Sequence, residues 1–365
     1  MYSIQDIIHV IEVQAPRCYQ ENYDNSGLLV GNRSKSISKA LLTLDCTENV
    51  IDEAIAQNCQ LIIAHHPILF SGIKSLTGKN YIERVLIKAI QHDIAIYACH
   101  TNLDNMKQGV NMKMAQRLGL QGCQILKPIE QTLNQIYVYV PSEYAEKVKD
   151  AMFEAGAGLQ GNYAECSFSI SGEGNYKPLD HAQPFLGSIN QRHAESEVKL
   201  ELLVKQHAVG AVEKAMKMVH PYEEIAYGIL ELKNKDYSMG AGLIGELSDV
   251  VSELDFFEHI KKTFNTGTIR HTQLLNKPIK KVALCGGSGS FLLQDALNHD
   301  ADIFITSDYK YHQFFDAENR LVIADIGHYE SEQYTPEIFY EILSKKFPKF
   351  AFQLSSVNTN PVYYY

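Results

Sequence analysis

Short apolar runs alternate with helically spaced apolar residues over the first third of the chain. The runs at residues 40–44, 61–64 and 94–99 are rich in Leu, Ile and Ala, which is typical of buried strands. The helical spacing predicts helices at 4–13, 48–57, 80–92 and 110–118. Strands separated by helices indicate βαβ units, and therefore a mainly parallel sheet.

The pattern changes near Pro128. Apolar runs predict strands at 135–140, 166–170, 198–204 and 226–232, and helical spacing predicts helices at 145–155 and 209–219. The order β-α-β-β-α-β is that of a split ferredoxin-like unit, which is complete in itself. Residues 172–192 are rich in Gly and polar residues and are expected to form a long loop.

The α/β pattern resumes after this middle region. Apolar runs predict strands at 281–285, 301–306 and 321–324, with a helix at 256–264. We therefore expect one discontinuous α/β domain of residues 1–127 and 238–365, interrupted by an inserted α+β domain at 128–237. The ends of the insert must then lie close together.

Three of the predicted strands are followed at once by side chains that bind metals. The run at 61–64 leads into His65 and His66, and the run at 94–99 leads to His100 and Asp104. The run at 321–324 leads to Asp325, Gly327, His328, Glu330 and Glu332. Ligands bind outside the carboxyl ends of strands in open α/β sheets. We therefore expect these side chains to meet at one sheet edge.

These residue types suit a two-metal centre. His328 and Glu332 are four residues apart, so a helix starting there would place both on one face. Imidazole and carboxylate ligands suit zinc, iron or manganese. Ions in such sites lie about 3.5–4 Å apart and activate a bound water. Any one of the three runs alone would be read as an ordinary strand end, but three together favour the metal site.

Two further motifs follow strands. Gly286, Gly287, Ser288 and Gly289 stand between a strand and a helix. This turn is either a plain tight turn or a phosphate site, since backbone N–H groups at a helix start favour anions. Asp308 and His312 follow the run at 301–306, where either would orient a ligand or act as a general base. Their alternative interpretation is a helix cap with an exposed histidine.

Composition narrows the class of protein. The 365 residues are 45% hydrophobic and 21% charged, with no stretch of 18 apolar residues, so no membrane span is expected. The N-terminal segment lacks a basic head and a cleavage site, so we expect a cytoplasmic protein. Seven scattered cysteines without CxxC exclude a disulfide framework. A net charge of −10 leaves nucleic-acid binding unsupported.

The motifs in this order resemble the GTP cyclohydrolase 1 type 2 homologue family, also called Nif-three-like. The resemblance spans nearly the whole chain. It rests on Tyr23–Leu28, Ala64–Pro67, His100–Asp104, Gly286–Gly289, and Gly327–His328 with Glu332. Tyr23 stands where the family usually has Trp, and Ile225 and Gly228 replace a usual Pro and Asp after Glu224.

The resemblance implies a function for each of these motifs. By motif, the ligands of two divalent ions, often zinc, would be His65, His66, Asp104, His328 and Glu332. Glu332 would bridge the ions, and His100 would lie just outside the ligands. The long form of the family carries a CutA/PII-like insert, which agrees with the β-α-β-β-α-β order and with residues 220–224 as its final motif. Similar proteins assemble as toroidal homohexamers.

Two classes of function remain open. The first is a metal-dependent hydrolase acting on a nucleotide or related phosphorylated compound, with Asp308 or His312 handling protons and Gly286–Gly289 holding a phosphate. The second is a non-enzymatic, metal-loaded oligomer that binds or regulates, since relatives of the insert sense ligands or trimerise. A ring around DNA would require a basic inner surface.

Overall fold

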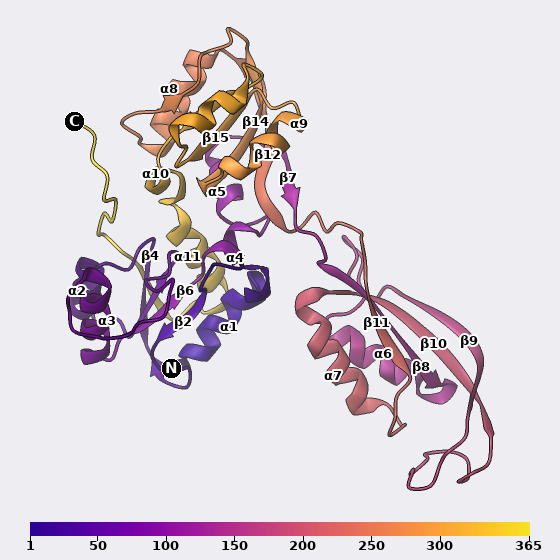
Figure 1. Cartoon of the computed structure of the whole chain (residues 1–365). Coiled ribbons are helices and arrows are strands. Elements are labelled where there is room, and N and C mark those ends of the chain that lie inside the picture. Colours follow the sequence, from indigo (N-terminus) through magenta and orange to yellow (C-terminus); the bar gives the residue numbers. More distant parts are fainter. The chain divides into compact units, whose positions relative to one another are not determined.

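A computed structural model describes residues 1–365. The chain forms two compact units (Figure 1). The outer unit consists of Met1–Pro128 and Tyr237–Tyr365, and the inserted unit consists of Ile129–Asp236. The two chain segments of the outer unit thus fold together, although more than a hundred residues separate them in sequence.

The first sheet of the outer unit has five strands in the order β17-β4-β5-β6-β2. The pairings from β17 to β6 are parallel, whereas β2 runs antiparallel to β6. The strands are β2 (Gly27–Val30), β4 (Lys39–Thr43), β5 (Leu61–Ala64), β6 (Ala95–Ala98) and β17 (Ala351–Leu354). All residues of β5 and β6 are buried, which explains their unbroken apolar sequences.

Helices cover both faces of this sheet. One core joins it to α1 and α11, and another joins its opposite face to α2 and α3. Side chains cap three of these helices at Ser3, Thr47 and Asn80, which satisfies their first N–H groups. The helices are α1 (Ile4–Gln14), α2 (Glu48–Ala56), α3 (Tyr81–Gln91) and α11 (Thr335–Lys346).

The second sheet of the outer unit has six strands in the order β13-β16-β15-β14-β12-β7. Only β14, β15 and β16 are mutually parallel. The strands are β7 (Gln121–Pro128), β12 (Gly240–Val251), β13 (Arg270–His271), β14 (Ile279–Ser288), β15 (Ile303–Ser307) and β16 (Val322–Asp325). Helices α5 (Val110–Leu118) and α8 (Glu253–Phe264) pack on one face, and α9 (Leu293–Asn298) packs on the other.

The expectation of a single, mainly parallel sheet is wrong. The outer unit has two sheets, and three of the five strand pairings in the second are antiparallel, namely β7 with β12, β12 with β14 and β13 with β16. Strand β7 was missed because most of its residues are exposed or half-buried, so its sequence shows no apolar run. The mixed α/β class itself is confirmed.

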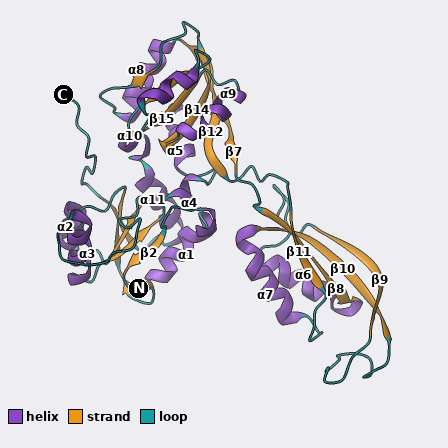
Figure 2. Cartoon of the chain, viewed as in Figure 1, coloured by secondary structure: helices purple, strands orange, loops and turns teal.

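The inserted unit is one antiparallel sheet with two helices. Its strand order is β11-β8-β10-β9, and α6 and α7 pack beside each other against the sheet (Figure 2). The chain order and strand order are those of a split ferredoxin-like unit. The elements are β8 (Leu133–Pro141), α6 (Ala145–Glu154), β9 (Ser167–Tyr176), β10 (His193–Lys205), α7 (Val209–Val219) and β11 (Tyr227–Glu231).

Strands β9 and β10 are longer than the sequence predicted. Their pairing extends to Tyr176 and His193, so the expected loop at 172–192 is shortened to residues 177–192. The residues of β9 are mostly exposed, and the strand therefore lacks the alternation that marks a half-buried strand.

The remaining elements are short. Strands β1 (Tyr2–Ser3) and β3 (Ser36–Ile37) pair with each other. Two short α-helices, α4 (Thr101–Asp104) and α10 (His328–Glu332), follow β6 and β16. Single 3-10 turns or helices lie at Arg17–Tyr19, Ser142–Tyr144, Gln206–Ala208, Ser290–Leu292 and Tyr311–Ala317. No helix is both long and apolar enough to cross a bilayer.

Candidate metal centre

Five of the predicted ligands meet within the outer unit. His65 and His66 directly follow β5, and Asp104 ends the short helix α4 after β6. His328 and Glu332 begin and end α10, which follows β16 of the other sheet. The ligands therefore come from the carboxyl ends of strands in two sheets, and the expectation of one common sheet edge is wrong.

Local backbone geometry directs these side chains. The N–H groups of His65 and His66 both donate to Leu44 O, so the chain bends where β5 ends. Gly327 precedes α10 with a φ of 96°, a conformation that favours glycine. Because α10 begins at His328, its side chain and that of Glu332 lie one helical turn apart on the same face.

Glu332 Oε2 lies among three imidazoles. It is 2.9 Å from His66 Nε2, 3.1 Å from His328 Nε2 and 3.8 Å from His65 Nε2. The Glu332 side chain is almost fully buried, so its charge is not shared with solvent. One carboxylate oxygen therefore connects the histidines of both sheets.

In each imidazole of the cluster, Nδ1 forms a hydrogen bond with an oxygen atom of the protein. The partners are Cys99 O for His65 (2.9 Å), Asp45 for His66 (2.7 Å), Asp24 for His100 (2.8 Å) and Asp308 for His328 (2.6 Å). Because Nδ1 donates to an oxygen in each case, Nε2 is the nitrogen left to bind a cation. Orientation of this kind is usual behind histidine ligands of metals.

Two buried atoms in the cluster have no hydrogen-bond partner. They are His65 Nε2 and Asp104 Oδ1, which lie 3.4 Å apart. Buried polar atoms are nearly always paired, because an unpaired one costs about 1–3 kcal/mol. These two atoms mark a place where a cation would satisfy both.

Burial is the main cause of the pKa shifts of both His65 and Asp104. Burial lowers the pKa of His65 to about 3, so its imidazole is neutral and can offer a lone pair at Nε2. Burial and the negative charge of Glu332 raise the pKa of Asp104 well above its usual range. A positive ion beside Asp104 would favour its ionised form.

The pKa values of His66 and His328 are raised, whereas that of His65 is lowered. Burial opposes the charge of His66, but hydrogen bonds to Asp45 and Glu332 outweigh it and raise its pKa to about 10. At His328 burial is likewise outweighed, chiefly by the charge of Glu332, and the pKa rises to about 11. A metal ion bound to these imidazoles would displace the two protons.

The donor set fits divalent metals. Three groups of side chains each place their ligand atoms within 4.8 Å of one another. They are His65 with Asp104 and Glu332, His66 with His328 and Glu332, and His65 with His66 and His100. Imidazole nitrogen combined with carboxylate oxygen suits zinc, iron and manganese. The structure thus contains His/Glu groups that could hold a metal ion.

The cluster opens into a cavity of about 700 Å³. His66, His100, Asp104, His328 and Glu332 all line it. The lining also includes four aromatic side chains, Tyr23, Phe70, Tyr81 and Phe291, and each of them is more than half exposed. The cavity therefore combines a charged floor with exposed ring faces.

A family model for Duf34/NIF3 (NGG1p interacting factor 3) matches residues 2–361. This chain belongs to the Duf34/NIF3 family. The resemblance expected from the motifs is therefore confirmed over almost the whole chain.

Relatives within the Duf34/NIF3 family match at full length. Proteins from Halalkalibacterium halodurans and Bacillus subtilis, each named GTP cyclohydrolase 1 type 2 homolog, are 38% and 37% identical to this chain. Both alignments cover 98% of this chain and 97% of the relative. A crystal structure of a Bacillus cereus protein related to NIF3 is 34% identical, with a TM-score of 0.87 over 100% of this chain and 99% of that one.

The glycine turn of this Duf34/NIF3 protein touches the cluster. Gly286 and Ser288 line the cavity, but the N–H groups of Gly286 and Gly287 already donate to Asn111 and Ser331, each at 2.9 Å. Gly287 has a φ of 60°, and a Cβ there would lie 2.4 Å from Glu332 Oε1. The absence of a side chain at Gly287 therefore makes room for the central carboxylate.

Of the two residues predicted to transfer protons, Asp308 and His312, only one lies at the cluster. Asp308 Oδ2 accepts from His328 Nδ1, which places Asp308 behind a predicted ligand. His312 is exposed on the 3-10 helix Tyr311–Ala317, where its ring stacks with Phe315, and it does not line the cavity. Only Asp308 is brought to the cluster.

Sequence reasoning did not assign two of the carboxylates that orient histidines. Asp45 follows β4 at the same sheet edge as His65 and His66. Its position directly after a predicted strand could have identified it as part of the cluster. Asp24 lies just before β2, in the motif Tyr23–Leu28 that carried the family resemblance without a role for this carboxylate. It holds His100 Nδ1 and also accepts from the Thr101 backbone N–H at 3.0 Å.

Proposed function

We propose that this Duf34/NIF3 protein binds two divalent metal ions and hydrolyses a nucleotide or related phosphorylated compound. The observation that carries the proposal is the pair of partnerless buried atoms, His65 Nε2 and Asp104 Oδ1, beside Glu332. Buried polar atoms are nearly always paired, and a cation between His65 Nε2 and Asp104 Oδ1 would supply the missing partner for both.

The ligand atoms divide into two sets that share one residue. His65, Asp104 and Glu332 would hold the first ion, and His66, His328 and Glu332 would hold the second. Glu332 would therefore bridge the ions. When bound, two such ions lower the pKa of water and polarise a phosphoryl or carbonyl oxygen.

The protein supplies the remaining functions from the cavity wall. His100 lines the cavity with Nδ1 held by Asp24, so Nε2 is placed to accept a proton from an attacking water. Asp308 keeps His328 in the tautomer that presents Nε2 to the ion. In this proposal Asp308 orients a ligand, and His312 has no part in the reaction.

The cavity lining supports a substrate with an aromatic ring. Phe70 and Phe291 are 55% and 58% exposed beside the charged cluster, and Tyr23 is 68% exposed. Exposed ring faces provide stacking surfaces for a nucleobase or pterin-like ring. The name of the relatives points to GTP as the first compound to test.

The test is hydrolysis by the metal-loaded full chain. Purified protein, reconstituted with zinc, manganese or iron, is incubated with GTP and a panel of nucleotide phosphoesters, and formate and phosphate release are measured. Turnover should follow metal content and be abolished in the double variant His65→Ala/His66→Ala. The variant His312→Ala is the matched control and should retain full activity. Equal turnover in the double variant would contradict the proposal.

A non-enzymatic role is favoured by one observation. The inserted unit contains its own cavity of about 720 Å³, lined entirely by residues of that unit. A metal-loaded binding or regulatory protein, assembled as an oligomer, would use such a second site to sense a ligand. Ligand binding without turnover, at any metal content, would support this alternative.

A further inference from the structure

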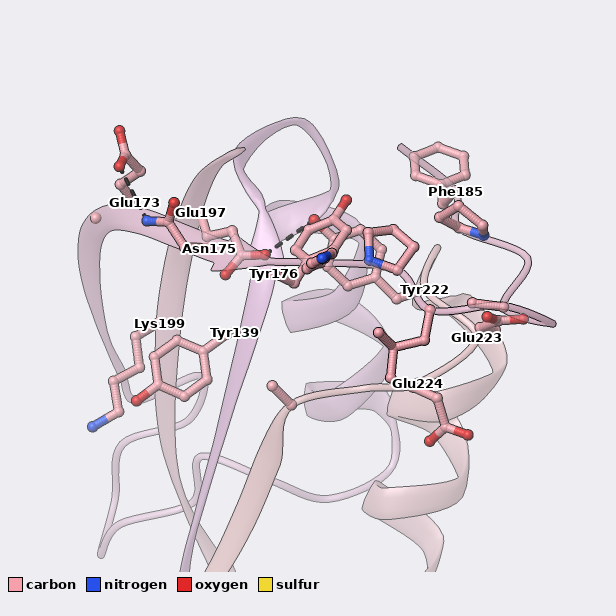
Figure 3. A pocket seen from close by; sticks show the side chains of 18 of the residues that line it. Tyr139, Glu173, Asn175, Tyr176, Phe185, Glu197, Lys199, Tyr222, Glu223 and Glu224 are labelled. Atoms are coloured by element: carbon pink, nitrogen blue, oxygen red, sulfur yellow. Dashed lines mark hydrogen bonds between the residues drawn. The ribbon is translucent and has the colours of Figure 1, made fainter. Parts of the chain in front are cut away.

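The inserted unit contains a cavity that has no part in the proposed metal chemistry. It lies beside β9 and β10 and is also lined by residues of the loop at 177–192 and of the turn that follows α7 (Figure 3). Its volume of about 720 Å³ is enough for a small organic molecule.

Aromatic rings form one wall of this cavity. The rings of Tyr176 and Tyr222 have their centroids 5.7 Å apart at an angle of 65°, and Phe185 lies 6.4 Å from Tyr222. Figure 3 shows the rings of Tyr176 and Tyr222 next to each other, with Phe185 on one side of them and Tyr139, beside Lys199, on the other. Grouped ring faces attract cations, because the electron-rich face of each ring is negative.

A buried carboxylate lies next to these rings. Glu197 on β10 is only 8% exposed, and its Oε1 accepts a hydrogen bond from Tyr222 Oη at 3.0 Å. A Cβ on Gly174 would lie 2.1 Å from the other oxygen, Oε2, so a glycine there leaves room for the carboxylate. A buried carboxylate with one neutral donor is costly unless a positive group comes near it.

The lysines of the lining do not supply that positive group. Lys199 Nζ lies 4.8 and 6.0 Å from the ring centroids of Tyr137 and Tyr139, but its ion pair is with Glu201, at 2.5 Å, and not with Glu197. Lys177 is exposed and forms no ion pair. Three more carboxylates line the cavity, at Glu173, Glu223 and Glu224, so its lining is net acidic.

Hydrogen bonds hold the covering loop in place. Gln183 N donates to Glu223 Oε1 at 2.7 Å, and Tyr176 Oη donates to Leu186 O at 3.0 Å. The loop at 177–192 is therefore tied both to the turn after α7 and to the end of β9. The cavity is a formed site and not merely a space beneath a free loop.

We propose that this cavity binds a small organic cation that carries an alkylammonium group. Glu197 provides the opposite charge, and the rings of Tyr176, Tyr222 and Phe185 surround the alkylated nitrogen. The site is independent of the metal centre, since all of its residues belong to the inserted unit.

Choline is a suitable probe because a neutral molecule of the same shape exists. Binding of choline and of 3,3-dimethylbutan-1-ol to the full chain is measured by saturation-transfer NMR and by calorimetry. Choline should bind at least about tenfold more tightly than the neutral alcohol, since only the cation gains from the rings and the carboxylate. Equal affinities, or no binding of choline at millimolar concentration, would overturn the proposal.

Two variants and one control locate the binding. Glu197→Gln should weaken choline binding about tenfold while leaving the alcohol unaffected. Tyr176→Leu should remove the preference for the cation while keeping an apolar wall, and it tests the site if Glu197→Gln fails to fold. Glu195→Gln is the matched control, because Glu195 lies on the same strand but outside the cavity lining.

Other results would refute the assignment. Choline binding that is unchanged in both Glu197→Gln and Tyr176→Leu would place the cation elsewhere. Choline affinity that falls as the protein concentration rises would mean that a second copy of the chain covers the cavity, and the site would then be an interface.

Discussion

At the scale of single residues, Glu332 connects the whole cluster. Its Oε2 contacts Nε2 of His66 and His328 and lies 3.8 Å from that of His65. The charge of His328 and the hydrogen bonds to Glu332 hold its pKa well below the usual range in spite of burial. The carboxylate is therefore ionised at neutral pH, as a bridging ligand must be.

Replacing this carboxylate should remove metal. In Glu332→Gln the neutral amide cannot bridge two cations, so metal content should fall from the proposed two ions per chain to one or none, as measured by plasma mass spectrometry. The control is Glu337→Gln, which removes a carboxylate paired with Lys113 and Arg117 away from the cluster. Unchanged metal content in Glu332→Gln would argue against the bridge.

Asp308 should affect metal affinity without contacting the ion. In Asp308→Ala the imidazole of His328 loses the acceptor that holds Nδ1, so metal affinity should fall about 10–100-fold. A competition titration against a chelator measures the change. Asp316→Ala, on the 3-10 helix that follows, should leave the affinity as it is. Equal affinities in both variants would show that Asp308 does not orient a ligand.

At the scale of secondary-structure elements, close backbone approach is as important as the ligands. The end of β14 passes so near α10 that Gly287 faces Glu332 Oε1 and Gly286 faces the Glu332 Cγ. The same glycine turn was read from sequence as a tight turn or a phosphate site. Two of its N–H groups are engaged within the protein, so positioning of α10 is the function that the structure supports for it.

Two glycine variants distinguish the effect of the contact between Gly287 and Glu332 from the effect of backbone strain. Gly287 and Gly122 have φ values of 60° and 62°, but nothing lies within 4 Å of a Cβ at Gly122. Both Gly287→Ala and Gly122→Ala should lose about 1–2 kcal/mol from the left-handed backbone, measured by denaturant unfolding. Only Gly287→Ala should also lose metal, because its methyl group displaces Glu332. Metal loss in both variants, or in neither, would contradict this role.

At the scale of the whole molecule, the proposed metal ligands lie in only one of the two units. The predicted ligands belong to the outer unit alone, and they join α10 of one sheet to the loops after β5 and β6 of the other. The inserted unit has its own core of residues from its sheet, α6 and α7. Ligand that binds the folded state stabilises only the unit that holds it.

Metal removal should therefore destabilise one unit. Treatment with a chelator should speed hydrogen exchange in α10, β5 and β6. If the free metal concentration was a thousand times the Kd, the free energy of opening these elements should fall by up to about 4 kcal/mol. Exchange in α6, α7 and β8 should not change. In Glu332→Gln the chelator should have little further effect. Equal changes in both units would show that metal does not act through this centre.

Part of this fold was readable from sequence because the signal was local. The buried strands β5 and β6 are unbroken apolar runs, and α5 spans Val110–Leu118, the range that its apolar spacing predicted. Strands β7 and β9 were missed or shortened because their exposed residues carry no apolar pattern. The division of the outer unit into two sheets depends on which strands pair, and periodicity does not contain that information.

The sequence by itself determined which residue types follow which strands, and with them the candidates from His65 to Glu332 and the family. Only the tertiary structure decided that His65 and Glu332, which are 267 residues apart in sequence, lie 3.8 Å from each other. It also decided that Asp308, and not His312, reaches the cluster, and that Glu197 accepts a hydrogen bond from the hydroxyl of Tyr222. The physical reason is that distances between side chains on different elements arise from packing, whereas periodicity describes one element at a time.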